Sequence, residues 1–256
     1  MINNFDIDQK EAREIFEDMI FSQIVKDPTP QLIKKAVLLG GQPGSGKSSL
    51  ARELLKNRPE IIFINGDDLR PYHPKYYFYL KNNNTEAADL TQAVCNYWIE
   101  MLINECAKRK LSMIIEGTMR KKSVPLETAH MLKKLNYLID VAVVSAPYEV
   151  SKASIQYRYQ ALKKMGISTR YTKQKSHDEA FHNIEGTLDA LIDSGLCEEF
   201  YIFQRHLGEF IQSTFQKEQK KEILNEFTIG RNREIEKDEI MEIDLLSKNE
   251  FKILIK

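Results

Sequence analysis

The sequence predicts an α/β fold in which a mainly parallel β-sheet carries helices on both faces. Short apolar runs, typical of strands that are buried on both sides, alternate along the chain with longer segments of helical periodicity. Each apolar run ends in polar loop residues, a pattern that favours parallel strands joined by helices. The length of 256 residues suits one large domain with additions, because domains average ~150 residues.

The composition excludes several classes of protein. The 37 basic and 37 acidic side chains balance, so the positive surplus of a general nucleic-acid binder is missing. The three cysteines form no CxxC pair, which disfavours a zinc site and a disulfide framework. No apolar run reaches the ~20 residues that cross a bilayer, and the amino terminus does not resemble a signal peptide. We therefore expect a cytoplasmic protein without nucleic-acid or membrane partners.

The individual elements follow from periodicity and from their end signals. Residues 5–24 have helical spacing, and the prolines at 28 and 30 end that helix because proline lacks a backbone donor. Another helix is expected to begin at Ser123 as its cap, with Pro125 in its first turn. The other expected strands are 36–39, 61–64, 111–115, 141–144 and 199–203, and the other expected helices are 47–55, 86–109, 148–164 and 176–193.

These elements divide a single domain, residues 1–256, into three parts. An N-terminal helix occupies residues 1–30, and the strands and helices of the core occupy residues 32–205. Residues 206–256 are expected to form a C-terminal helical extension, because the charged tail from residue 217 has a helical period.

A glycine-rich loop follows the first strand directly and precedes the next helix. Residues 41–48, GQPGSGKS, match the phosphate-binding pattern G-x-x-x-x-G-K-[ST]. Its glycines let backbone amides approach phosphate oxygens, and the helix N-terminus favours negative charge. Lys47 is expected to bind the β- and γ-phosphates, and the Ser48 hydroxyl to bind Mg²⁺. The predicted cofactors are therefore ATP and Mg²⁺, and the predicted binding residues are Gly41, Gln42, Pro43, Gly44, Ser45, Gly46, Lys47, Ser48 and Ser49.

Two classes of nucleotide-binding protein with this loop fit the rest of the chain poorly. A GTPase would carry an N/T-K-x-D motif, but residues 172–175, TKQK, lack the aspartate. A mechanical ATPase would end a strand in adjacent carboxylates, whereas Glu116 is followed by Gly-Thr. The pattern therefore favours a small-molecule kinase, in which an acid follows the second strand.

Asp67 and Asp68 stand at the end of that second strand. Because the carboxyl ends of parallel strands border one crevice, Lys47, Asp67 and Glu116 are expected to converge there. A carboxylate in that crevice can orient an acceptor hydroxyl and take its proton. Neighbouring side chains of an extended chain point oppositely, so one of the two aspartates is expected to face the acceptor. Taken alone, Asp67 and Glu116 also suit simple turn or cap positions.

At these residues the sequence resembles the zeta toxin family, phosphate-binding-loop kinases of bacterial toxin–antitoxin systems. The resemblance spans roughly residues 32–205 and rests on segments 38–48, 65–67, 73–74, 115–120, 124–129, 158–159, 169–172 and 177–178. It implies a three-layer P-loop kinase fold and ATP/Mg²⁺-dependent phosphorylation of the 3′-hydroxyl of the amino sugar of UDP-N-acetylglucosamine. It further implies a toxin that blocks cell-wall synthesis and a cognate antitoxin protein as partner.

The resemblance also implies roles for individual residues. Asp67 would be the general base, and Arg158 and Arg170 would neutralise charge around the γ-phosphate, a task that suits a planar guanidinium. The implied contacts of the sugar nucleotide are Asp67, Glu100, Glu116, Thr118, Arg120 and Thr128. Without the resemblance, Glu100 and both arginines are ordinary surface charges, and the two histidines His73 and His177 suit structural hydrogen bonds.

Some residues depart from the family pattern, and two other functions stay open. Asp68 stands where the family more often has a hydroxyl residue, and Met119 is expected to reshape the acceptor pocket. The aromatic residues 76–79 could reshape the pocket by stacking on a base or sugar, but we expect them to pack under a loop. The chain could instead phosphorylate another small hydroxyl compound, such as a nucleotide, a dinucleotide or an antibiotic. A nucleotide-dependent interaction protein without chemistry is the third hypothesis, suggested by the amphipathic N-terminal helix and the charged tail.

Overall fold

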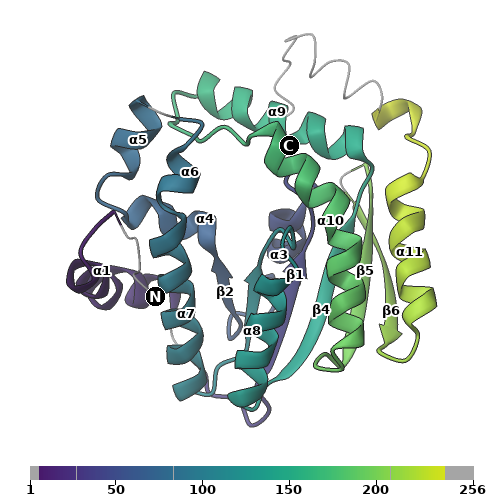
Figure 1. Ribbon diagram of the computed structural model, residues 1–256, viewed down its shortest axis with the longest axis horizontal. Helices are drawn as coiled ribbons and strands as arrows, with labels where there is room; N and C mark the ends of the chain where they lie inside the picture. Colours follow the sequence, from purple (N-terminus) through teal and green to yellow (C-terminus); the bar gives the residue numbers. More distant parts are fainter. Residues whose placement is uncertain (1–5, 27, 83, 208, 240–256) are drawn as a thin grey trace.

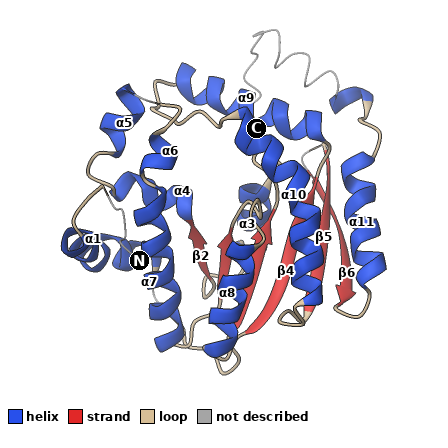
Figure 2. Cartoon of the chain, viewed as in Figure 1, coloured by secondary structure: helices blue, strands red, loops and turns tan. Residues whose placement is uncertain are grey.

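A six-stranded sheet organises the computed structural model, which describes residues 6–26, 28–82, 84–207 and 209–239. Figure 1 and Figure 2 show helices packed around the sheet. The strand order is β2-β3-β1-β4-β5-β6. The strands are β1 (Lys35–Gly40), β2 (Ile62–Asn65), β3 (Met113–Glu116), β4 (Leu138–Ser145), β5 (Glu199–His206) and β6 (Glu209–Gln216). The first five are parallel and β6 is antiparallel to β5, which confirms the predicted mainly parallel α/β fold.

Strand β6 was not predicted and corrects the interpretation of the C-terminal part. The segment expected to be helical from residue 206 begins with this strand, which pairs with β5 from Glu199↔Gln216 to His206↔Glu209. Adjacent apolar residues Phe210 and Ile211 interrupt the alternation that signals a strand, so the pairing with β5 decides the conformation. The predicted helix does follow, as α11 (Lys220–Asn232). Residues 240–256 of the predicted tail lie outside the described residues.

The helices agree with the predictions except in the segment after β2, at a break in the helix predicted over 86–109, and at the starts of the N-terminal helix and of the helices predicted from residues 123 and 176. The N-terminal helix runs through α1 (Gln9–Ile15), a π-helical turn (Phe16–Ile20) and α2 (Phe21–Ile24). The others are α3 (Lys47–Leu55), α4 (Gly66–Leu69), the 3₁₀ turn η2 (Arg70–Tyr72), α5 (Tyr76–Asn82), α6 (Ala87–Leu90), α7 (Gln92–Lys108), α8 (Ser123–Lys134), α9 (Tyr148–Lys164) and α10 (Gln174–Asp193).

Two of the differences have local causes. The helix predicted over 86–109 breaks at Thr91, whose hydroxyl donates to the carbonyl of Ala87 and accepts a hydrogen bond from Arg70. Ser123 is the first residue of α8 and not its cap, a position that Lys122 takes. In the described ranges, no helix has both the length and the apolar character needed to cross a bilayer.

Two apolar layers cover the two faces of the sheet. The N-terminal helix, α7, α8, α10 and α11 bury one face, and α3 packs on the other. Figure 1 shows α7, α8 and α10 on the side of the sheet toward the viewer. Leu50 and Ala51 of α3 pack with Leu39 of β1, so the helix that follows the glycine-rich loop is anchored directly on the central strand.

The N-terminal helix is attached to α7. Asp8 caps its first turn, since its carboxylate accepts a hydrogen bond from the backbone of Lys10. The indole Nε1 of Trp98, on α7, donates to the carbonyl oxygen of Ala12 at 2.8 Å. Trp98 is fully buried between the two elements. The amphipathic face of this helix is therefore part of the core.

Candidate active site

The glycine-rich loop fits closely against α9. Gly44 has a φ of 79°, and a Cβ there would lie 2.0 Å from the backbone oxygen of Ser151 on α9. A side chain is therefore excluded both by conformation and by contact. The side chain of Gln42 also reaches this region and donates to the carbonyl of Ala146 at 2.9 Å. The loop is thus held between β1 and the start of α9.

Lys47 points back into the loop. Its side chain is buried (7% exposed), and Nζ donates to the carbonyl oxygens of Gly41 at 2.7 Å and Gln42 at 3.0 Å. Burial lowers the pKa of Lys47, while the carboxylates of Glu116 and Asp67 oppose this shift. The hydroxyl of Ser45 is buried and has no hydrogen-bond partner among the described residues. An ammonium group and an unpaired hydroxyl inside a glycine loop at a helix N-terminus suit phosphate oxygens.

Asp67 stands in the first turn of α4, directly after β2. The side chain of Asn65 caps this turn by accepting a hydrogen bond from the backbone of Asp67 at 2.9 Å. Arg70 Nε donates to Asp67 Oδ1 at 2.9 Å, and Arg170 donates to Oδ2. Burial acts to raise the pKa of Asp67, but the two guanidinium groups outweigh it and hold the pKa well below its ordinary value.

Asp68 differs from Asp67 in its exposure, its partners and the direction of its pKa shift. It is exposed and makes no ion pair with any residue that the structure describes. Burial and the charge of Asp67 raise the pKa of Asp68. Both aspartates lie in a helical turn, so the expected opposite orientation of neighbours in an extended chain does not apply here.

Glu116 ends β3 and brings a third strand into the site. It pairs in register with Leu39 of β1 and with Asn65 of β2, so the three strand ends are adjacent, as the predicted topology requires. The hydroxyl of Ser48 donates to Glu116 Oε2 at 3.3 Å. Burial raises the pKa of Glu116, and Lys47 opposes this shift. A hydroxyl and a carboxylate side by side are oxygen ligands of the kind that Mg²⁺ accepts.

Two arginines approach this group of residues from the other side of the site. Arg170, in the loop before α10, contacts Asp67, and Nη2 of Arg158 on α9 lies 3.5 Å from Thr172 Oγ1 in the same loop. Burial and the charge of Arg170 lower the pKa of Arg158, whereas Asp67 and Glu116 act in the opposite direction. The structure therefore brings Lys47, Asp67, Glu116, Arg158 and Arg170 into one charged cluster.

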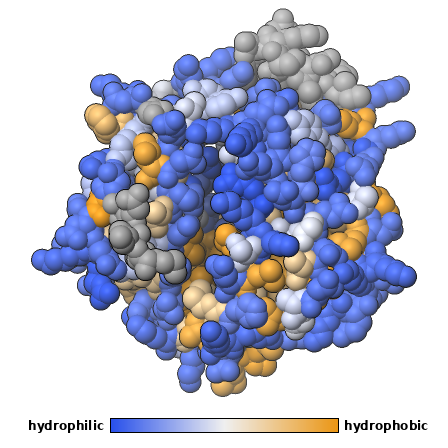
Figure 3. Space-filling view, in the orientation of Figure 1, coloured by the Kyte–Doolittle hydropathy of each residue, from blue (hydrophilic) through white to orange (hydrophobic). Residues whose placement is uncertain are grey.

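The remaining predicted substrate contacts lie farther out. Thr118 is exposed in the loop after β3, and Glu100 is exposed on α7. Arg120 Nη1 lies 3.2 Å from Ser176 Oγ and 3.6 Å from Glu179, and Thr128 donates to the carbonyl of Val124 within α8. In the described residues, no hydrogen bond or ion pair joins these four to Asp67 or Lys47. Figure 3 shows a hollow at the centre of the face on which Figure 1 places α7, α8 and α10.

One predicted contribution to the acceptor pocket, that of Met119, needs correction. Met119 is buried, and its Sδ packs against Gly40 so closely that a Cβ added to Gly40 would lie only 2.2 Å from that sulfur atom. It therefore fills the core beneath the site and does not line a pocket. Among the aromatic residues of α5, Tyr76 is buried, whereas Tyr77 and Phe78 are exposed.

The two histidines hold hydrogen bonds, as the sequence suggested. His177 Nε2 lies 2.8 Å from Ser151 Oγ, and its Nδ1 lies 3.2 Å from Asp178. His73 Nδ1 accepts from the backbone of Lys75 at 3.1 Å. Because Ser151 also contacts Gln42 at 3.4 Å, the network of His177 supports the glycine-rich loop from below α9.

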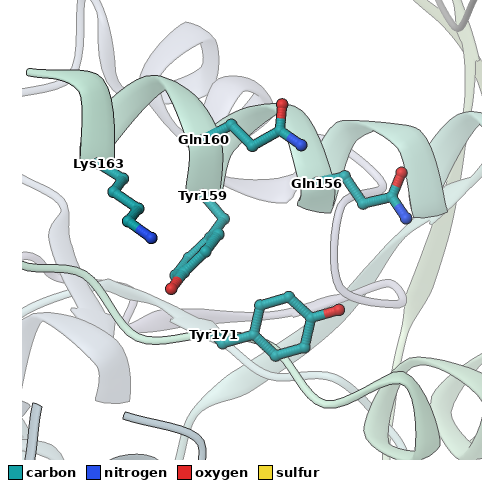
Figure 4. Close-up of a pocket in the computed structure, with 5 residues that line it drawn as sticks. All are labelled: Gln156, Tyr159, Gln160, Lys163 and Tyr171. Atoms are coloured by element: carbon teal, nitrogen blue, oxygen red, sulfur yellow. The ribbon is translucent and has the colours of Figure 1, made fainter. Parts of the chain in front are cut away.

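A pocket lies between α9 and the loop that precedes α10 (Figure 4). It has a volume of about 600 Å³, and its lining residues are Gln156, Tyr159, Gln160, Lys163 and Tyr171. Figure 4 shows the four α9 side chains above Tyr171 of the following loop. The rings of Tyr159 and Tyr171 meet nearly edge to face, with centroids 5.2 Å apart. None of the predicted site residues lines this pocket.

Sequence reasoning missed Arg70. This arginine is buried and contacts Asp67 from within the same turn. The spacing of three residues between an acid and an arginine was the available signal, because such pairs meet on a helix.

Comparisons with known proteins identify the family of this chain. The family model described as "Zeta toxin" matches residues 21–227. The chain is 27% identical over 205 residues to "Toxin PezT" of Streptococcus pneumoniae serotype 4, covering 79% of this chain and 81% of that protein. It is 29% identical over 200 residues to "Toxin zeta" of Streptococcus pyogenes, covering 74% and 70%.

Solved structures show the same fold. One from the PezAT chromosomal toxin–antitoxin system of Streptococcus pneumoniae superposes with a TM-score of 0.80 at 22% identity, covering 96% of this chain and 98% of that one. The complex of AvrRxo1-ORF1 and -ORF2 with ATP has a TM-score of 0.58 at 12% identity, covering 86% and 73%. The three-layer P-loop kinase fold is therefore confirmed.

Proposed function

This chain belongs to the zeta toxin family, and we propose that it is an ATP- and Mg²⁺-dependent kinase that phosphorylates the 3′-hydroxyl of the amino sugar of UDP-N-acetylglucosamine. As a toxin of a toxin–antitoxin system it would thereby block cell-wall synthesis, and residues 1–256 would act as a single kinase domain. The observation that carries the proposal is the charged cluster, in which Lys47, Asp67 and Arg170 from three separate segments converge.

The residues of the cluster suit phosphoryl transfer. Asp67 would take the proton of the acceptor hydroxyl while the hydroxyl oxygen attacks the γ-phosphorus of ATP. The bond between the γ-phosphorus and the bridging oxygen would break, and ADP would leave. Lys47, Arg158 and Arg170 would stabilise the negative charge on the transferred group.

The loop and the end of β3 would hold the two cofactors. The residues 41–49 would bind the triphosphate of ATP, for which the buried, unpaired hydroxyl of Ser45 and the ammonium group of Lys47 provide donors. Ser48 would bind Mg²⁺, with the carboxylate of Glu116 next to it. When bound, Mg²⁺ would neutralise charge on the phosphates.

The acceptor would lie in the hollow bordered by α7 and α8. Its proposed contacts are Asp67, Glu100, Glu116, Thr118, Arg120 and Thr128. Glu100 and Thr118 are exposed and open to a ligand, and Arg120 holds a loose contact with Glu179 at 3.6 Å that a phosphate or uracil oxygen would replace.

The test is mass spectrometry of UDP-N-acetylglucosamine incubated with the purified protein, ATP and Mg²⁺. We expect one added phosphate with the wild type, none with Lys47→Met, and an unchanged yield with Lys56→Met, which alters an exposed lysine at the end of the same helix. ADP formation with another hydroxyl compound but not with the sugar nucleotide would assign the kinase a different acceptor. Bound ATP that is neither hydrolysed nor transferred would contradict kinase activity altogether.

We further propose that a cognate antitoxin protein binds this chain, because solved structures with this fold include one from a toxin–antitoxin system. Expression of the chain alone is expected to be toxic, and expression of Lys47→Met is not. Loss of toxicity on co-expression of a neighbouring gene product that co-purifies with the chain would identify the partner.

A further inference from the structure

Arg70 is a buried side chain that makes a dense set of hydrogen bonds behind Asp67. Its side chain is 6% exposed. Besides its bond to Asp67, Nη1 donates to the carbonyl of Ala88 at 2.6 Å and to Thr91 Oγ1 at 2.8 Å, and Nη2 donates to Gln92 Oε1 at 2.8 Å. A guanidinium group has five N–H donors in a fixed plane, so these bonds determine the orientation of the whole group.

Arg70 forms an ion pair with one residue among those that the structure describes. Asp67 is the only carboxylate that it contacts among the described residues, and its other partners are neutral oxygens. A buried charge is costly unless it is paired and hydrogen-bonded, so the pair with Asp67 stabilises this conformation. The side chain of Asp67, in contrast, is 41% exposed. A rigid, buried donor therefore holds an accessible carboxylate.

The partners of Arg70 connect the end of β2 with the start of α7. Thr91 lies at the break between α6 and α7, and Gln92 is the first residue of α7. The amide nitrogen of Gln92 continues the chain of hydrogen bonds to Asn96 Oδ1 at 2.7 Å. The orientation of Asp67 thus depends on the same helix that carries the proposed substrate contact Glu100.

We propose that Arg70 is a positioning residue for the phosphoryl transfer: it fixes Asp67 through Oδ1, so that Oδ2 is the oxygen that meets the acceptor hydroxyl. This inference rests on the proposed function, because it assigns Arg70 a role only if Asp67 is the base. Arg170, a member of the charged cluster, donates a hydrogen bond to Oδ2, so that oxygen is directed toward the cluster.

The charge on Asp67 depends on several groups. Those that face it or interact with it electrostatically are Arg70, Arg170, Lys47, Arg158, Glu116, Asp68, Tyr76 and Cys95. Removal of Arg70 takes away one of the two guanidinium groups in direct contact. The pKa of Asp67 must then rise, and protonation of the base must begin at a higher pH.

The experiment measures kcat, KM and the pH dependence of kcat for Arg70→Gln and Arg70→Lys. For Arg70→Gln we expect a loss of about 10²-fold in kcat, the size typical of a misplaced reacting group, with KM for ATP nearly unchanged. The acidic limb of its pH profile should move to higher pH. Arg70→Lys restores the charge but not the planar fork, so the limb should return toward that of the wild type while kcat stays low.

Two further variants separate positioning from folding. Thr91→Val and Gln92→Met remove anchors of Arg70 without changing Arg70 or Asp67, and we expect each to lower kcat while the acidic limb stays in place. Arg231→Gln is the matched control, because the side chain of Arg231 is also largely covered (10% exposed) and pairs with Glu185 on α10, outside the charged cluster. Its kcat should equal that of the wild type.

The outcomes distinguish this inference from the proposed function. If the wild type transfers phosphate and Arg70→Gln has the same kcat and the same pH profile, Arg70 does not position the base. If Arg70→Gln does not fold, the two anchor variants decide, and an unchanged kcat in both overturns the inference. A folded wild type that transfers phosphate to no acceptor overturns the proposed function, and the role of Arg70 with it.

Discussion

Arg170 donates a hydrogen bond to Oδ2 of Asp67 and so joins two residues that are 103 positions apart in the sequence. The bond connects the loop before α10 to the end of β2. Arg170 is also proposed to bind the γ-phosphate. A bound γ-phosphate would attract Arg170 and so weaken the hydrogen bond between Arg170 and Asp67. We therefore expect nucleotide binding to free Oδ2 of Asp67 for the acceptor hydroxyl.

The two adjacent aspartates are expected to respond differently to substitution. Asp67→Asn should lower kcat by about 10²–10⁴-fold, the usual contribution of a general base, and leave the affinity for ATP nearly unchanged. Asp68→Asn should have a much smaller effect, because Asp68 is exposed and lacks an arginine partner among the described residues. Steady-state kinetics and ATP-binding calorimetry on both variants test this. A larger kcat loss for Asp68→Asn would exchange the two roles.

The ion pairs of Asp67 make the stability depend on pH in a predictable direction. The pKa of Asp67 is lower in the folded protein than the ordinary value, so the ionised carboxylate stabilises the fold above the unfolded pKa, at about pH 4. This stabilisation is lost as the pH falls below about 4 toward the lowered folded pKa. The free energy of unfolding of the wild type should therefore exceed that of Asp67→Asn at neutral pH.

Urea denaturation of both proteins at a series of pH values measures this difference. It should shrink continuously as the pH falls below about 4. A difference that stays constant over that range would mean that the arginine pairs of Asp67 do not contribute to stability.

Two glycines are expected to react oppositely to replacement by alanine. Gly44→Ala places a Cβ against the Ser151 carbonyl in a backbone conformation that disfavours side chains, so it should destabilise the protein and abolish nucleotide binding. Gly186→Ala lies inside α10, where a Cβ meets no atom within 4 Å. It should stabilise the protein by about 0.5–1 kcal/mol, the helix propensity difference.

Thermal unfolding and nucleotide binding of the two glycine variants provide the measurement. An unchanged affinity for ATP in Gly44→Ala would mean that the loop can move away from α9 at little cost.

The thiols are expected to be unreactive in the folded protein. All three cysteines are buried, and burial raises the pKa to about 11 for Cys95 and to about 12 for both Cys106 and Cys197. The reactive thiolate is therefore almost absent near neutral pH. Ellman's reagent should detect no thiol in the native protein and all three after unfolding in guanidinium. Rapid reaction of any one in the native protein would indicate local opening of the core around it.

Much of the sheet could be predicted because its strands are buried on both faces. The run 36–39 is continuously apolar, whereas the helices 47–55 and 148–164 have helical periodicity and the predicted bounds. β6 could not be found in this way, because its sequence is neither a continuous apolar run nor a regular alternation, and its conformation depends on the pairing with β5. The short helices between β2 and α6 likewise depend on contacts such as those of Arg70.

In the site, too, some features follow from the sequence pattern and others depend on tertiary contacts. Lys47, Asp67 and Glu116 end or follow neighbouring strands, and topology alone brings such positions together. The network of Arg70 joins residues up to 22 positions apart through side-chain geometry, which periodicity does not encode. Met119 was expected to reshape the pocket, but its side chain is buried in the core next to Gly40, on a backbone with a positive φ of 50° that the sequence does not signal.

Trp98 gives this chain an internal optical reporter. It is the only tryptophan in the sequence, and its indole is bonded to Ala12 in the interior. Its emission should therefore change when the first helix separates from α7, whereas circular dichroism averages over every helix, including α11 at the opposite edge. An emission change at a lower temperature than the loss of ellipticity would show that the N-terminal helix separates from α7 before the rest of the protein unfolds.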